Sequence, residues 1–175
     1  MIRVKRGLDV PLAGEPQQVI HPARPVRSVA LLGVDYHGLK PGMQVQVGDK
    51  VQCGQVLFTD KNHATIHFTA PAGGVVSAIN RGAQRVFQSL VIEVDSNSEP
   101  VQFGFWSEKE LLQLDADVIR NQLLASGLWT ALRTRPFSKI PAPDSKPHSI
   151  FVTAIDTHPL AADPAIVIAE KAAAF

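Results

Sequence analysis

The sequence predicts an α+β fold, with a β-rich module over residues 1–100 and a helical segment leading into an α/β domain over residues 101–175. Three observations predict it. Short runs of β-branched and aromatic residues, separated by Gly, Pro and Asp turns, continue to residue 94. The polar run 95–100 then breaks this pattern. Beyond it, apolar residues recur at helical spacing behind capping residues.

The composition excludes several classes of protein. The 175 residues include 17 Lys or Arg and 16 Asp or Glu, for a formal charge of +1, so the chain lacks the basic surface of a nucleic-acid binder. The single cysteine, Cys53, cannot form an internal disulfide, and no zinc-like His/Cys spacing is present. We predict a packed thiol and a reducing, cytoplasmic setting. No signal peptide and no apolar window near the ~20 residues of a membrane helix are found, so we predict a soluble chain without a membrane span.

The central stretch 43–79 predicts a small β module. Strands are expected at 45–47, 56–58 and 65–68, with a polar hairpin tip at 60–63. The spacing V-x-x-G-D-x-V-x-x-G-Q, followed by A-P-x-x-G-x-V, resembles the biotinyl/lipoyl-like barrel-sandwich hybrid fold. This spacing is typical of the fold and not of one activity.

A carrier function is one alternative that this resemblance raises. In carrier members the modified lysine stands at the hairpin tip, eight residues before the proline of the A-P pair. That position is His63 here, counted from Pro71, and the nearest lysine is Lys61. The displaced lysine argues against a swinging arm, and His63 is predicted to be a solvated turn residue.

Two further strands and a boundary complete the predicted module. Residues 29–32 and 86–94 are strand candidates, and the rest of 1–42 is predicted to be irregular β structure. The polar run 95–100 is the predicted domain boundary.

Two helices are predicted after the boundary. Ser107 and Glu110 have the spacing of a capping box. Asp115 is the predicted N-cap of the second helix, and Gly127 is its predicted C-terminal stop. The predicted apolar stripe of this helix comprises Val118, Ile119, Leu123 and Leu124.

The last third predicts a loop, a strand and a helix. The proline-rich stretch 129–147 is predicted to be a loop. Residues 149–155 have the pattern of a buried strand, and Asp163 before Pro164 predicts a helix over 165–175. A strand and helix of this kind are the first unit of a Rossmann-like α/β domain, so the domain is predicted to be truncated and the chain a fragment.

Several long strings together resemble one family. They are IRVKRGLDVPLAGEPQQVI, GQVLFTDK with FTAPAGGVVSAINRG, and SGLWTALRTRPFSKIPAPD with IFVTAIDTHPLAADP. In order and over the whole chain, they resemble the A subunit of the bacterial sodium-translocating NADH:quinone oxidoreductase. The resemblance implies a cytoplasmic protein, peripheral on the inner membrane and docked chiefly on the membrane-embedded B subunit. It implies a translocase that passes electrons from NADH through flavins and iron–sulfur centres to ubiquinone and exports sodium.

The resemblance implies no cofactor on this segment, because the family's flavin and cluster sites lie in other subunits. The resemblance also implies the quinone-binding role that has been attributed to the A subunit, but it assigns this role to no residue of this stretch. The run Ser126–Lys139 is similar in placement to the S-G-L-R-G-R-G-G-A-G-F-P-T loop of the flavin- and NADH-binding subunit of complex I. In that loop, glycines let the backbone come close to the flavin phosphate, because a Cβ would block the approach. No glycine lies between Leu128 and Lys139, so the resemblance implies that this loop no longer holds a phosphate. Asp156 and Thr157 resemble the N-A-D-E-x-x-P loop of the same scaffold, with its second acid replaced.

Three basic residues are the candidate site. Arg133, Arg135 and Lys139 are candidates for binding an anion or the quinone headgroup, while the favoured interpretation of these residues is a docking or solvated surface. Trp129 is predicted to be a core or interface anchor. No catalytic residue and no metal ligand are predicted, since no Ser/His/Asp set or carboxylate pair has suitable spacing.

A nucleotide- or flavin-binding subunit, related to the C subunit of the Rnf complex, is the other open alternative. That subunit carries cysteine motifs for iron–sulfur clusters and a glycine loop, and both are absent from this sequence.

Overall fold

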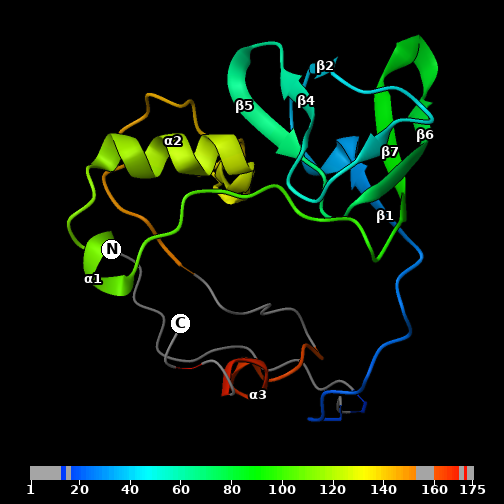
Figure 1. Cartoon of the computed structure of the whole chain (residues 1–175). Coiled ribbons are helices and arrows are strands. Elements are labelled where there is room, and N and C mark those ends of the chain that lie inside the picture. The colour runs from blue at the N-terminus through cyan, green and yellow to red at the C-terminus, as the bar shows by residue number, and fades with distance from the viewer. Residues whose placement is uncertain (1–12, 15–16, 153–159, 170–171, 173–175) are drawn as a thin grey trace. The chain divides into compact units, whose positions relative to one another are not determined.

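The computed structural model describes residues 13–14, 17–152, 160–169 and 172 (Figure 1). They belong to two compact units, which we treat separately. The first is residues 25–146, and the second combines the described parts of 1–24 and 147–175.

Two antiparallel sheets form the centre of the first unit (Figure 1). The first sheet has the order β1 (Ser28–Leu32), β7 (Phe87–Val94), β6 (Gly74–Arg81) and β3 (Lys50–Val51). The second has the order β2 (Pro41–Met43), β4 (Val56–Asp60) and β5 (His63–Thr69). Short strands joined by tight turns are what the alternating sequence predicts.

The hydrophobic core joins the two sheets. Phe58 of β4 stacks on Phe68 of β5 with ring centroids 4.7 Å apart, and it meets Phe87 of β7 edge-on at 5.2 Å. Such aromatic pairs add about 0.5–1.5 kcal/mol beyond the area they bury. The residues with at most 1% exposure come from both sheets and are Leu57, Phe58, Ile66, Phe68, Val76, Leu90 and Ile92.

The predicted strands at 29–32, 56–58, 65–68 and 86–94 are confirmed by β1, β4, β5 and β7. The strand predicted at 45–47 is wrong, because the chain crosses between the sheets there. The Gln44 amide still donates to the Leu57 carbonyl of the second sheet at 2.9 Å, whereas the Gly48 amide donates to the Val76 carbonyl of the first at 2.8 Å. Val47 lies on this crossing and is 58% exposed.

The predicted helices follow the sheets. They are α1 (Glu108–Leu111) and α2 (Ala116–Ser126), after which comes a 3-10 turn, η3 (Leu128–Ala131). The Asp115 carboxylate accepts the Asp117 amide at 2.8 Å, and Gly127 ends α2 with a φ of 82°, so both predicted ends are confirmed.

The apolar stripe of α2 is only partly covered. Leu124 is buried, but Val118 and Ile119 are each 41% exposed. The last turn of the helix is the part tied to β5, where the Thr69 hydroxyl donates to the Ser126 carbonyl at 2.9 Å. Gly127 is required here, because a Cβ on it would lie 2.4 Å from Thr69 Oγ1.

Trp129 anchors the loop that follows. Its side chain is 7% exposed within the core cluster, and its indole Nε1 donates to the Pro141 carbonyl at 2.9 Å. The prediction that Trp129 is a packing anchor is confirmed. The predicted domain boundary at residue 100 stays a prediction.

The second unit departs most from the sequence prediction. The buried strand predicted at 149–155 is wrong over 149–152, which is irregular, with Ile150 and Phe151 69% and 89% exposed. No described strand pairs with these residues, and an unpaired strand leaves its amides without ladder bonds. Residues 153–155 lie outside the described residues.

The last helix begins where predicted. The Asp163 carboxylate accepts the Ala165 amide at 2.9 Å and caps α3 (Pro164–Ile168). The sequence predicts a helix as far as residue 175, but 170–171 and 173–175 lie outside the described residues. The same is true of the predicted Asp156–Thr157 loop and of residues 1–12.

Candidate functional site

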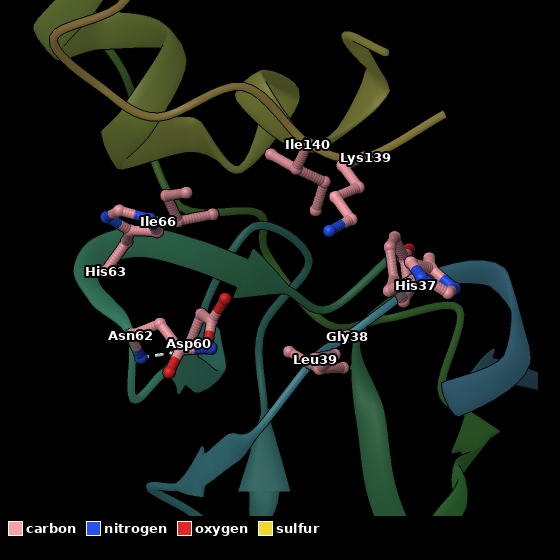
Figure 2. A pocket seen from close by; sticks show the side chains of 10 residues that line it. His37, Gly38, Leu39, Asp60, Asn62, His63, Ile66, Lys139 and Ile140 are labelled. Atoms are coloured by element: carbon pink, nitrogen blue, oxygen red, sulfur yellow. Dashed lines mark hydrogen bonds between the residues drawn. The ribbon is translucent and has the colours of Figure 1, made fainter. Parts of the chain in front are cut away.

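A pocket of about 290 Å³ lies where three segments of the first unit meet (Figure 2). One segment follows the 3-10 turn η1 (Gly33–Asp35), the second is the β4–β5 hairpin, and the third is the loop after η3. The lining residues are Tyr36, His37, Gly38, Leu39, Asp60, Asn62, His63, Ile66, Lys139 and Ile140.

The β4–β5 hairpin forms one wall. Asp60 pairs with His63 across the hairpin, so Lys61 and Asn62 are its two turn residues. The Asn62 amide donates to Asp60 Oδ1 at 3.0 Å, which fixes the turn (Figure 2). The sequence predicts His63 in the turn. It is exposed, as predicted, but it is the first residue of β5, and Lys61 takes the turn position.

The loop after η3 forms the opposite wall and presents Lys139. The Thr134 amide donates to the Lys139 carbonyl at 2.8 Å, and the Ser138 amide donates to the Thr134 carbonyl at 2.9 Å. Ile140 packs against the core next to this closed loop. Figure 2 shows the Lys139 ammonium reaching into the space between the hairpin and the 37–39 segment.

Tyr36 supplies the inner side of the pocket. Its ring meets Phe68 edge-on at 4.9 Å, and the Arg133 guanidinium lies 5.5 Å from its centroid. Burial raises the pKa of the Tyr36 hydroxyl; Arg133 lowers it less, and Asp35 raises it slightly. The hydroxyl therefore stays protonated at neutral pH and can donate a hydrogen bond.

The structure separates the three predicted basic residues. Lys139 lines the pocket. Arg133 donates from Nη1 to the carbonyls of Thr130 and Leu132, so its guanidinium supports the loop and the Tyr36 ring. Arg135 is exposed and is not among the residues that line the pocket. Their binding role stays a prediction.

Sequence reasoning missed Tyr36, His37 and Asp60. The available signal was the only tyrosine of the chain, followed directly by histidine and glycine between two predicted β segments. What brings them to Lys139 is the pairing of β2 with β4 together with the packing of the loop after η3 on the core, and the local pattern contains neither.

The lining of the pocket combines hydrogen-bond donors with apolar surface. Lys139 and Tyr36 offer donors, and Leu39, Ile66 and Ile140 offer apolar contact. Within the described residues no group of three or more His, Cys, Asp or Glu could hold a metal ion.

The loop 128–139 does not fit a flavin phosphate. Such a site needs free backbone amides that point at the anion. Here the amides of Leu132, Thr134 and Ser138 donate to carbonyls of the loop itself, and the Trp129 side chain is buried in the core cluster. The lost glycines agree with this geometry.

Comparison with known proteins gives the family. The profile of the NqrA N-terminal barrel-sandwich hybrid domain matches residues 2–95, and that of the NqrA second alpha/beta domain matches residues 114–175. The chain belongs to the NqrA family.

Close relatives agree with this NqrA assignment. Proteins named as the A subunit of Na(+)-translocating NADH-quinone reductase are 62% identical in Pseudomonas aeruginosa, 58% in Saccharophagus degradans and 56% in Hahella chejuensis, each over all 175 residues. The chain spans 39% of the length of each. The predicted family, the hybrid β domain and the following α/β segment of NqrA are thereby confirmed. Among the described residues, no helix has the length and apolar character needed to span a membrane.

Proposed function

We propose that this NqrA chain serves in the A subunit of a sodium-translocating NADH:quinone oxidoreductase, on the cytoplasmic face, where it docks chiefly on the membrane-embedded B subunit. The observation that supports membership of this subunit is the match of all 175 residues to a relative of that name at 62% identity. The β module is the docking element in this proposal, because Val34 and Val47 of this module are 85% and 58% exposed and offer apolar surface to a partner.

Co-purification tests the docking role. The full-length protein, expressed with its neighbours in the complex, is compared with a deletion of residues 1–100. We expect the deletion to abolish assembly and quinone reduction. Normal assembly and turnover of the deleted chain would overturn the docking role.

We also propose that the pocket around Lys139 binds the quinone headgroup. Lys139 and the Tyr36 hydroxyl would each donate to one quinone oxygen, and Leu39, Ile66 and Ile140 would contact the ring. The volume of about 290 Å³ is just below the ~300–1,000 Å³ of small-molecule sites, which suits one ring better than a dinucleotide. Arg133 has the supporting role of holding Tyr36.

Labelling with a photoreactive ubiquinone tests this site in the assembled complex. Lys139→Gln and Tyr36→Phe should each reduce labelling about tenfold, since a hydrogen bond to a charged or buried partner contributes on the order of 1–3 kcal/mol. Lys146→Gln is the matched control, because Lys146 is exposed and does not line the pocket. Equal labelling of the unmodified chain and all three variants would remove the pocket from consideration.

A carrier function has one specific observation in its favour, the place of Lys61 in the two-residue turn of the β4–β5 hairpin. Intact-mass measurement of the chain from its native host tests it, with Lys61→Arg as control. A biotinyl or lipoyl adduct that disappears in the variant would support the carrier, and an unmodified mass would exclude it.

A further inference from the structure

A second concavity, of about 500 Å³, shares Tyr36, Gly38 and Leu39 with the first pocket. We call it the basic groove. Its cations come from three segments of the chain. Lys40 lies directly before β2, Lys61 lies in the β4–β5 turn, and Arg81 and Arg85 lie at the β6–β7 turn. No Asp or Glu is among its lining residues.

The four cations have no carboxylate partner in the part of the chain that the structure describes, where the ion pair found is that of Arg120 with Asp117. Arg81 donates from Nη1 to the Arg85 carbonyl at 3.3 Å, which holds its guanidinium beside the turn. Like charges gathered in one concavity repel each other, and an anion placed among them relieves that repulsion.

The backbone around the groove is closed by hydrogen bonds. The Lys61 amide donates to the Lys40 carbonyl at 2.8 Å, which holds the two lysines side by side. At the other hairpin the Gly82 amide donates to the Val86 carbonyl at 2.8 Å. Gln84 and Arg85 there have φ angles of 52° and 61°, in the left-handed region that side chains rarely adopt. Residues with positive φ are common in the tight turns that join antiparallel strands, and here they set the path of the β6–β7 turn.

We infer that the basic groove binds a phosphate group. The two arginines offer planar donor forks and the two lysines offer point charges, a set that matches the several oxygens and the double charge of a phosphate. A single carboxylate would leave most of this charge uncompensated. Val86 and Phe87 also line the groove, and Val86 is 62% exposed, so an uncharged part of the ligand has apolar surface to contact. The phosphate can come from a soluble polyphosphate or from a phospholipid headgroup.

Two binding measurements on the intact chain distinguish these sources. Tripolyphosphate is titrated by calorimetry, and vesicles of phosphatidylcholine with phosphatidylglycerol are used in co-sedimentation, both at the same low salt. The groove variants are Arg81→Gln with Arg85→Gln, and Lys40→Gln with Lys61→Gln. The second pair leaves the bond from Arg81 to Arg85 intact. The control, Lys109→Gln with Lys146→Gln, removes the same charge from exposed positions outside the groove.

We expect each groove pair to weaken binding about tenfold or more, because each removes two charge-assisted contacts, while the control changes it less than about twofold. Binding of tripolyphosphate alone, or of tripolyphosphate and vesicles together, assigns a phosphate site open to soluble ligands. Binding of vesicles alone assigns a headgroup site. The inference would be overturned if neither tripolyphosphate nor the vesicles bind, or if the control variant loses as much binding as the groove variants. Lys139→Gln, which tests the quinone pocket, should leave this binding unchanged, so the two proposals fail separately.

Discussion

Similar apolar runs are buried in one unit of the chain and exposed in the other. In the first unit, Leu57 and Phe58 of β4 are completely buried, with β2 and β5 paired on either side. In the second, Ile150 and Phe151 are 69% and 89% exposed, and no described strand pairs with them. Apolar β-prone residues therefore form a strand only where another segment satisfies their backbone, and that requirement is tertiary.

The largest effect that tests this comparison is truncation of one aromatic residue in each unit. Phe58→Ala should lower the free energy of unfolding by about 3–5 kcal/mol, because it leaves a cavity beside Phe68 and Phe87. Phe151→Ala should change it by less than about 0.5 kcal/mol, because that ring is exposed. Urea unfolding followed by circular dichroism measures both. If Phe58→Ala does not fold, Phe58→Leu should show a smaller loss. Equal effects at 58 and 151 would contradict the contrast between the units.

A smaller effect tests whether α2 belongs with the β module. Gly127→Ala should cost about 2–4 kcal/mol, since it places a Cβ in the left-handed region and against Thr69. Gly48→Ala is the matched control, because Gly48 also has a positive φ but its Cβ would meet nothing within 4 Å. It should cost about 1–2 kcal/mol. The same urea titration measures both. An equal loss in the free energy of unfolding at the two glycines would mean that the Thr69 side chain moves aside without a measurable penalty.

Helix caps give a third, weaker comparison. Asp115→Ala should lower the free energy of unfolding by about 1 kcal/mol, because α2 loses its N-cap while packed on β5. Asp163→Ala removes the same kind of bond from α3. It should leave the main unfolding transition in place and raise only the amide exchange of Ala165. A shift of the main transition by Asp163→Ala would show that the two units unfold together.

The smallest effect is a pH dependence confined to α1. The Ser107 hydroxyl and amide both donate to Glu110 Oε2, at 2.6 and 2.7 Å, and these bonds lower the pKa of Glu110 below its usual value. A lowered folded-state pKa means that the stabilisation is present above the unfolded pKa and is lost as pH falls through the folded pKa. Ser107→Ala should move the pKa of Glu110 back towards its ordinary value. Carbon-detected NMR titration of the Glu110 carboxyl measures this, with Glu108 as the internal control. An identical titration of Glu110 in the unsubstituted protein and in Ser107→Ala would contradict this prediction.

Local patterns predicted most of the first unit, because its strands alternate clearly and its helices carry their own caps. Asp115, Gly127 and Asp163 act where the sequence places them, since a cap depends only on its neighbours. The failures are tertiary in origin. The crossing at 45–47 depends on where Gly48 meets Val76, and the exposure of 149–152 depends on a missing partner strand among the described residues.

The candidate site was predictable only in part. Lys139 is predictable as a loop cation and lines the pocket, whereas Arg133 is used within the loop and Arg135 lies away from the pocket. Tyr36 reaches the site because β1 and η1 carry it over Phe68, which no local spacing encodes. The basic groove was missed for the same reason, since its four cations come from separate segments of the chain.

Tyr36 has one further consequence, because it lines both the pocket and the groove together with Gly38 and Leu39. Two concavities that share a wall are thermodynamically linked whenever occupation of one displaces that wall. If a ligand in the groove shifts Tyr36 and changes the affinity of the pocket by some factor, a ligand in the pocket must change the affinity of the groove by the same factor. The shared wall of Tyr36, Gly38 and Leu39 is thus where the two sites would be coupled.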